Sequence, residues 1–242
     1  MEINVFMNQT ELNDLYDYDM YIYQNSKYFK FSVDSVLLAE FVRVRKNAKN
    51  VLDLCSGNAP IPLILSKKFG DRIKIDAYEL QPEICELGKM SIEKNNARNI
   101  NYYNDDIKNI DFKKKYDIVT CNPPYFKYHD DKVLNDNQVL AKARHEISTN
   151  LDEVVRISAK SLKNGGYFYL VHTSSRIVDI IECLKKYNFG IKSIVPVYDN
   201  RNGESSLVLI EALLNGKDYV KIERPVYIDE NKTYQGILGG KK

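Results

Sequence analysis

Strand-like and helix-like segments alternate from about residue 50 to residue 190, and this alternation limits the possible folds more than any other feature. Short apolar runs rich in β-branched or aromatic residues predict strands, and longer segments with helical spacing predict helices. The expected strands are 50–55, 73–80, 100–105, 116–121 and 167–173, and the expected helices are 61–69, 82–96 and 151–162. Such alternation is typical of βαβ units, so we expect a mainly parallel sheet.

The end of this pattern is different. Segments 191–199 and 205–214 both read as strands, and the turn "NRNG" lies between them, which predicts an antiparallel hairpin. The sequence therefore predicts an α/β fold with a doubly wound, mainly parallel, seven-stranded sheet that ends in an antiparallel hairpin. We expect a single domain, residues 1–242, with its core at about 28–214 and short extensions at 1–27 and 215–242.

Composition predicts an ordinary globular protein. The chain has 242 residues, 44% hydrophobic and 28% charged, and its apolar runs are too short to span a bilayer. Its first 21 residues are too acidic and polar for a secretory signal. The four cysteines are scattered, so we expect no disulfide framework, no metal site and a cytoplasmic location. The net charge of +2 is a weak signal, because a nucleic-acid binder needs only a local basic patch.

The segment "VLDLCSGNAPIPL" joins the first expected strand to a helix through a loop of small residues. Ligands of doubly wound sheets bind at the carboxyl ends of the strands. A pyrophosphate cradle needs several glycines, and this loop has only Gly57, while no Walker loop is present. Asp53 lies where a phosphate would sit, so it favours a ligand with an ammonium or sulfonium group.

Acidic residues also end the next two strands. Glu79 is positioned to accept hydrogen bonds from two ribose hydroxyls. Asp106 could accept from an adenine amine while the Ile107 N–H donates to the ring. A cationic end, a ribose and an adenine together describe S-adenosylmethionine.

Four segments, "VLDLCSGNAPIPL", "AYEL", "NDDI" and "CNPPY", resemble in order and spacing the class I S-adenosylmethionine-dependent methyltransferases, which have a Rossmann-like fold. The resemblance covers roughly Tyr28 to Leu214, and it departs where Cys55 and Ala59 replace the usual glycines of the loop. It implies S-adenosylmethionine as the cofactor. The cofactor-binding residues that it implies are Asp53, Cys55, Gly57, Asn58, Glu79, Leu80, Asp106, Ile107 and Asn122.

In this family the motif Asn-Pro-Pro-Tyr marks methyl transfer to a planar nitrogen, which implies catalytic roles for Asn122, Pro123, Pro124 and Tyr125. The Asn122 side-chain oxygen and the Pro123 carbonyl would accept hydrogen bonds from the two N–H groups of the amine. The prolines restrict the backbone and so fix both acceptors. Tyr125, together with Phe126, offers a face on which a flipped base could stack.

The motif alone leaves the substrate open between a base amine and a protein glutamine. Release-factor glutamine methyltransferases share the tetrapeptide but have a sizeable helical domain before it, and DNA adenine methyltransferases usually add a large target-recognition domain. An N-methyltransferase of an rRNA base is a further alternative. The non-enzymatic alternative is an RNA- or cofactor-binding module whose active site is no longer functional.

The segments "YFKFSVDSVLLAEF", "NPPYF" and "KARHE" resemble the bacterial tRNA adenine-N6 methyltransferases, which modify adenosine 37 beside the anticodon of a valine tRNA. This resemblance implies that Asp34 or Ser35 contacts the methionine end of the cofactor. It also implies a tRNA anticodon stem-loop as the partner, with no membrane, metal or obligate protein partner. The residues expected to bind this substrate are Tyr125, Phe126, Lys127, Arg144 and His145.

Overall fold

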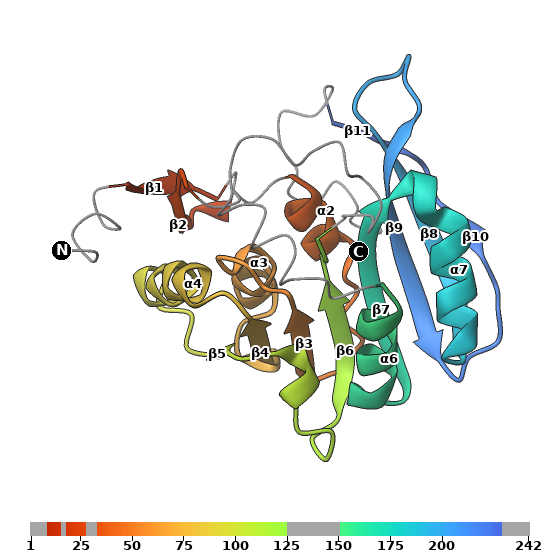
Figure 1. Ribbon diagram of the computed structural model, residues 1–242, viewed down its shortest axis with the longest axis horizontal. Helices are drawn as coiled ribbons and strands as arrows, with labels where there is room; N and C mark the ends of the chain where they lie inside the picture. Colours follow the sequence, from red (N-terminus) through yellow and green to blue (C-terminus); the bar gives the residue numbers. More distant parts are fainter. Residues whose placement is uncertain (1–8, 16–17, 28–32, 125–150, 229–242) are drawn as a thin grey trace.

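The computed structural model describes residues 9–15, 18–27, 33–124 and 151–228, and its centre is a sheet covered by helices (Figure 1). The strands are β3 (Asn50–Leu54), β4 (Lys74–Glu79), β5 (Ile100–Asn104), β6 (Tyr116–Cys121), β7 (Leu162–Thr173), β8 (Phe189–Tyr198), β9 (Ser205–Leu214), β10 (Lys221–Ile222) and β11 (Val226–Tyr227). The helices are α2 (Val33–Phe41), α3 (Pro60–Phe69), α4 (Pro82–Lys94), α6 (Leu151–Ser161) and α7 (Ile177–Lys186), with short 3-10 turns at η2 (Gly70–Arg72), η3 (Ile107–Asn109) and η5 (Ser174–Arg176).

The strand order confirms the doubly wound α/β fold. The sheet runs β10-β8-β9-β7-β6-β3-β4-β5, and β11 also pairs with β8. From β3 the chain builds outward through β4 to β5, then returns to the other side of β3 with β6 and β7, all in parallel pairs. The predicted hairpin is also confirmed, because β9 pairs antiparallel with both β7 and β8. The strand order therefore reverses between β3 and β6, where ligands bind in such sheets.

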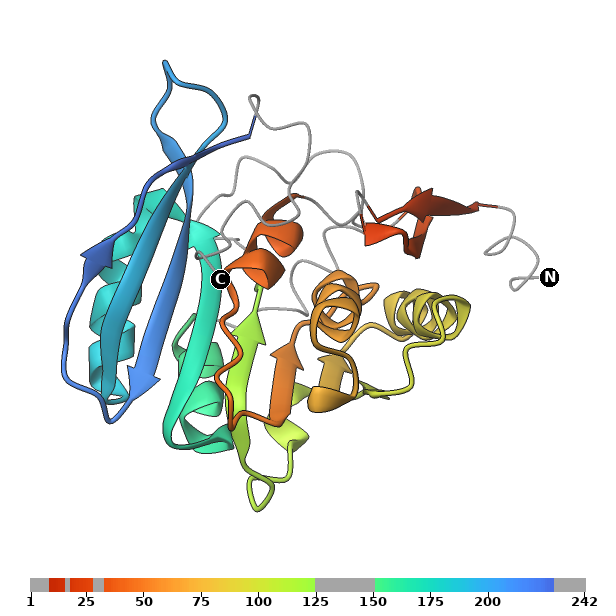
Figure 2. The same ribbon diagram turned by 180° about the vertical axis from the view of Figure 1, so that it is seen from behind.

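Four short strands and the helix α7 were not predicted. The seven expected strands all belong to the sheet, and β10 and β11 of the C-terminal extension pair in parallel with β8, which gives nine strands among the described residues. Their two-residue length leaves no periodic pattern to detect. The N-terminal extension forms a separate antiparallel hairpin of β1 (Thr10–Asp14) and β2 (Tyr21–Asn25). Figures 1 and 2 both show this hairpin beside α3 and α4, away from the β8–β9 edge.

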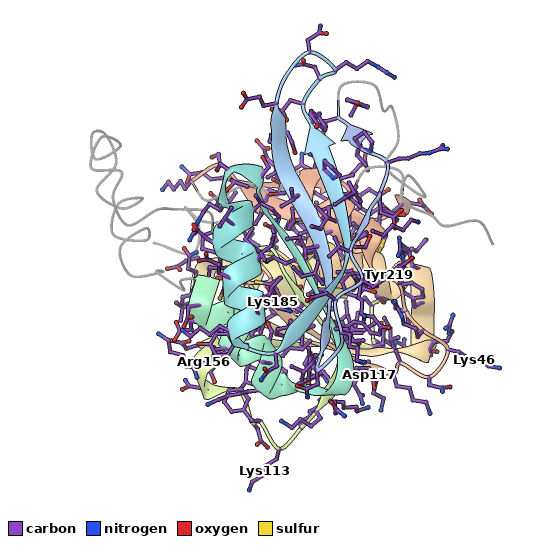
Figure 3. All side chains as sticks on the ribbon, turned by 90° about the vertical axis from the view of Figure 1, so that its right-hand side faces the viewer. Lys46, Lys113, Asp117, Arg156, Lys185 and Tyr219 are labelled. Carbon is purple, nitrogen blue, oxygen red and sulfur yellow. The ribbon has the colours of Figure 1, made fainter. Side chains whose placement is uncertain are left out.

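Apolar side chains bury both faces of the sheet, as the near-continuous hydrophobic strands require. In β3, Val51 packs in one core with residues of α2 and α3, whereas Leu52 and Leu54 pack in a second core with residues of α6 and α7. Figure 3 views the edge formed by β8 and β10, with Lys185 of α7 and the exposed Tyr219 labelled. No helix within the described ranges is long and apolar enough to cross a membrane.

A polar cluster anchors the segment between α2 and β3 to the sheet. Arg45 donates to the Glu211 carboxylate of β9 at 3.0 Å, and the Tyr169 hydroxyl of β7 donates to the same carboxylate at 2.8 Å. The Arg45 guanidinium also lies over the Tyr167 ring, 3.7 Å from its centroid. Because Glu211 is 3% exposed, its charge depends on these partners. This cluster fixes the end of α2, whose beginning lies at the site described below.

We predict that Arg45→Met lowers the free energy of unfolding by about 2–3 kcal/mol, because it leaves the buried Glu211 carboxylate without its closest cation. Lys46→Met is the matched control, since Lys46 is an exposed neighbour. Urea denaturation of both variants measures the difference. Equal losses in the two variants would contradict this role of Arg45.

Candidate active site

The parallel pairing of β3 with β4 and β6 gathers the predicted site residues at one edge of the sheet. Leu54 is in register with Tyr78 on one side and with Cys121 on the other. The residues that follow these three positions are Cys55, Glu79 and Asn122, so the loop after β3 lies between Glu79 and Asn122. Figure 1 shows α2 beyond the end of β6, on the same side of the molecule.

The loop Cys55–Ala59 is here named the cofactor loop. Its backbone adopts a conformation that is rare for residues other than glycine. The φ angles of Cys55, Gly57 and Ala59 are 57°, 59° and 73°, so two non-glycine residues adopt the left-handed region. Cys55 and Ala59 thus follow a backbone path for which glycine is the usual residue. A Cβ added to Gly57 would meet no atom within 4 Å, so open space lies beside the loop.

Neighbouring strands hold the cofactor loop in this conformation. The Gly57 N–H donates to Glu79 at 2.9 Å, and the Ser56 N–H donates to the Tyr78 carbonyl at 2.9 Å. The Tyr102 hydroxyl of β5 donates to the Gly57 carbonyl. The loop is therefore fixed by groups of β4 and β5.

Asp53 lies beneath this loop and is fully buried. Its two oxygens accept hydrogen bonds from the Thr120 hydroxyl at 2.5 Å and the Ser56 hydroxyl at 2.7 Å. Burial raises the pKa of the Asp53 carboxyl to about 7, against the opposing effect of the two hydroxyl donors. Asp53 thus joins β3, β6 and the loop, and its direct contact with a cationic ligand stays a prediction.

Glu79 ends β4 beside the loop. Its carboxylate accepts from the Gly57 N–H and from the Gln81 N–H, both at 2.9 Å, and burial raises its pKa. The next residue, Leu80, is 39% exposed. The pair therefore presents a carboxylate next to an accessible apolar surface.

Asp106 and Ile107 begin the short turn η3 after β5. The Asp106 carboxylate caps this turn by accepting from the Lys108 N–H at 2.9 Å, and Ile107 is buried. N–H groups in the first turn of a helix have no partner within that helix. The geometry is compatible with the predicted contacts of Asp106 and Ile107 with an adenine.

Asn122 meets α2 through a side-chain hydrogen bond. Its Nδ2 donates to the Ser35 hydroxyl at 2.9 Å, and the Ser35 N–H donates to Asp34 at 2.8 Å. Asp34, Ser35 and Pro123 are all buried. The bond orients the Asn122 amide with its nitrogen toward α2, and it brings two predicted sites, far apart in sequence, into contact.

The remaining predicted residues, Tyr125, Phe126, Lys127, Arg144 and His145, lie outside the described residues, and their roles stay predictions. In the described part of the chain, no group of three or more His, Cys, Asp or Glu side chains could hold a metal ion.

Three contacts of this site were not predicted from the sequence. Thr120 binds Asp53 across the β3–β6 pair, and its signal was a polar residue within the apolar run "YDIVTC". Tyr102 fills the space beside Gly88 of α4, where an added Cβ would lie 2.7 Å from the ring. The glycine inside a helix was the sequence feature that could have indicated this close packing. The third contact joins Asn58 to the Tyr23 carbonyl of β2 at 2.8 Å.

The site residues fit S-adenosylmethionine. The open space beside Gly57 would receive the amino-acid part, and the Glu79 carboxylate would accept hydrogen bonds from the ribose. Leu80 would cover one face of the adenine, and Asp106 with the Ile107 N–H would bind its edge. When bound, this cofactor supplies a methyl group attached to a sulfonium.

We predict that Asp53→Asn changes how stability depends on pH. The folded protein retains a proton on Asp53 up to a pKa of about 7, whereas the unfolded chain releases it near 3.8. Between these values the folded state binds more protons, so wild-type stability falls relative to the variant as the pH rises, by at most about 1.4 kcal/mol per pH unit. Denaturant unfolding of both proteins from pH 4 to pH 7 measures this. A difference that is independent of pH would contradict the burial of Asp53.

Comparison with known proteins gives a consistent picture. The methyltransferase small domain family matches residues 28–187. A tRNA1(Val) (adenine(37)-N6)-methyltransferase of Aliivibrio salmonicida is 24% identical over 181 residues, covering 74% of this chain and 75% of that protein. One of a Flavobacteriaceae bacterium is 22% identical and covers 86% and 87%. The Type II methyltransferase M.AccI of Acinetobacter calcoaceticus is 30% identical over 83% of this chain but only 30% of its own length.

Solved structures share the fold. A structure described as a predicted O-methyltransferase from Agrobacterium tumefaciens superposes with a TM-score of 0.63 at 17% identity, over 80% of this chain and 86% of that one. The aTrm5 chain in its complex with tRNALeu gives 0.62 at 14% identity, over 86% and 53%. With more than half of its length matched by one family, the chain belongs to the methyltransferase small domain family, and it is a class I methyltransferase that uses S-adenosylmethionine.

Proposed function

We propose that this enzyme methylates the exocyclic N6 amine of an adenosine in tRNA, at position 37 beside the anticodon of a valine tRNA. The observation that carries the proposal is the position of Asn122, at the switch point of the sheet and with its amide bound to Ser35. The names of the relatives in Aliivibrio salmonicida and the Flavobacteriaceae bacterium support the substrate. A cytoplasmic location, where tRNA is modified in bacteria, forms part of the proposal.

The chemistry of an adenine amine explains the need for this arrangement. The N6 lone pair is delocalised into the ring, so the amine is a poor nucleophile. Hydrogen bonds from its two N–H groups to the Asn122 oxygen and the Pro123 carbonyl would localise that pair and direct it at the methyl group. Holding the reacting atoms in line supplies most of the rate. A strong general base is not required, because the methylated ammonium product is highly acidic.

The hydrogen bond to Ser35 supports this role of Asn122. An amide has one acceptor oxygen and one donor nitrogen, and a target amine needs the oxygen. Because Nδ2 is directed to Ser35 at 2.9 Å, the oxygen occupies the other branch of the side chain. The backbone at 122–124 is constrained by Pro123 and Pro124, so both acceptors are held before a substrate arrives.

The proposal is tested by incubating the enzyme with labelled S-adenosylmethionine and separate fractions of unmodified tRNA, rRNA, release factor and duplex DNA. We expect label in the tRNA fraction, and digestion should release it as N6-methyladenosine from valine tRNA. Label in a protein glutamine, in an rRNA base or in DNA would contradict the substrate. The DNA fraction is included because DNA adenine methyltransferases also act on an adenine amine.

We predict that Asn122→Ala lowers kcat by on the order of 100-fold, the cost of one hydrogen bond that strengthens in the transition state. Binding of S-adenosylmethionine is measured separately, because the family resemblance also places Asn122 among the cofactor-binding residues. Asn101→Ala is the matched control, since the Asn101 amide binds Asp76 at 2.9 Å, away from this site. Steady-state kinetics separate kcat from KM, and an unchanged kcat for Asn122→Ala would refute the mechanism.

A further inference from the structure

The β1–β2 hairpin of the N-terminal extension is attached to the cofactor site. One edge of β2 pairs with β1, and its other edge is bound by side chains in place of a third strand. The side-chain amide of Asn95, the C-cap residue of α4, binds both the Tyr21 N–H at 2.9 Å and the Tyr21 carbonyl at 2.6 Å. The Ser91 hydroxyl of α4 accepts from the Tyr23 N–H at 2.9 Å. These contacts fix the position of β2 along α4.

The last polar contact of this edge reaches the cofactor loop. The Asn58 Nδ2 donates to the Tyr23 carbonyl at 2.8 Å, and Asn58 is only 5% exposed. Tyr23 is thus held through its N–H by α4 and through its carbonyl by the loop. A buried amide that lost this acceptor would leave a donor unsatisfied, which is costly.

The loop conformation needs such support. Cys55 and Ala59 have positive φ angles, and residues in these regions persist only where their surroundings hold them, at a cost of order 1–3 kcal/mol each. Glu79 and Tyr102 hold the peptide groups of Gly57. Asn58 is the next residue, and its anchor comes from an element outside the main sheet.

We propose that the β1–β2 hairpin is part of the cofactor site, and that Asn58 is a positioning residue that transmits the placement of the hairpin to the cofactor loop. The hairpin thereby sets the affinity for S-adenosylmethionine without touching it. The inference rests on the cofactor and is independent of the RNA substrate.

The test is a double-mutant cycle on the binding of S-adenosylhomocysteine, the form of the cofactor that remains after methyl transfer, measured by calorimetry without RNA. Asn58→Ala removes the loop contact, and Ser91→Ala loosens the same Tyr23 peptide from α4. We expect Asn58→Ala to weaken binding about tenfold, as the loss of one buried hydrogen bond implies. Ser91→Ala should weaken binding by about threefold or more, because it also removes one hydrogen bond to Tyr23. The double variant should bind no more weakly than Asn58→Ala alone.

Unchanged binding by Ser91→Ala, or effects that multiply in the double variant, would overturn the proposal, since Asn58 would then act without the hairpin. Asn95→Ala loosens the hairpin at a half-buried position, whereas Ser91 is fully buried, so it replaces Ser91→Ala if that variant does not fold. Asn101→Ala serves again as the control with wild-type affinity. Because the assay contains no RNA, a failure of the proposed substrate leaves its outcome unaffected.

Discussion

The parallel pairing of β3 with β4 on one side and β6 on the other is the constraint on which the rest of the structure depends. It places three strand ends at one edge of the sheet, and each end supplies a different function. The end of β3 supplies the cofactor loop, the end of β4 supplies Glu79, and the end of β6 supplies Asn122. None of these groups is near another in sequence, so the site exists only when the sheet has formed.

Buried carboxylates organise this edge from below. Asp53 accepts hydrogen bonds from the hydroxyls of Ser56 and Thr120. Glu79 accepts hydrogen bonds from the N–H groups of Gly57 and Gln81. Burial raises the pKa of both carboxyls, and these hydrogen bonds act in the opposite direction. The two acids therefore have a structural role in the described protein in addition to the ligand contacts proposed for them.

Much of this arrangement was predictable from the sequence, because the hydrophobic periods of the main strands and helices are strong and the switch-point rule places their ends together. Other parts depend on tertiary contacts that leave no local pattern. The edge of β2 is completed by Ser91 and Asn95 of a distant helix, and the two residues of β10 have no period. Cys55 and Ala59 adopt the left-handed backbone against their own preference, so their conformation follows from Glu79, Tyr102 and the hairpin.

The central claim is that the site holds a planar amine between the Asn122 oxygen and the Pro123 carbonyl, and that this amine belongs to adenosine 37 of a tRNA. The most direct measurement compares methyl transfer to two transcripts of valine tRNA, one with adenosine and one with guanosine at position 37. We expect N6-methyladenosine in the first transcript and no methylation at position 37 in the second. Equal methylation of both transcripts, or methylation of neither, would contradict it.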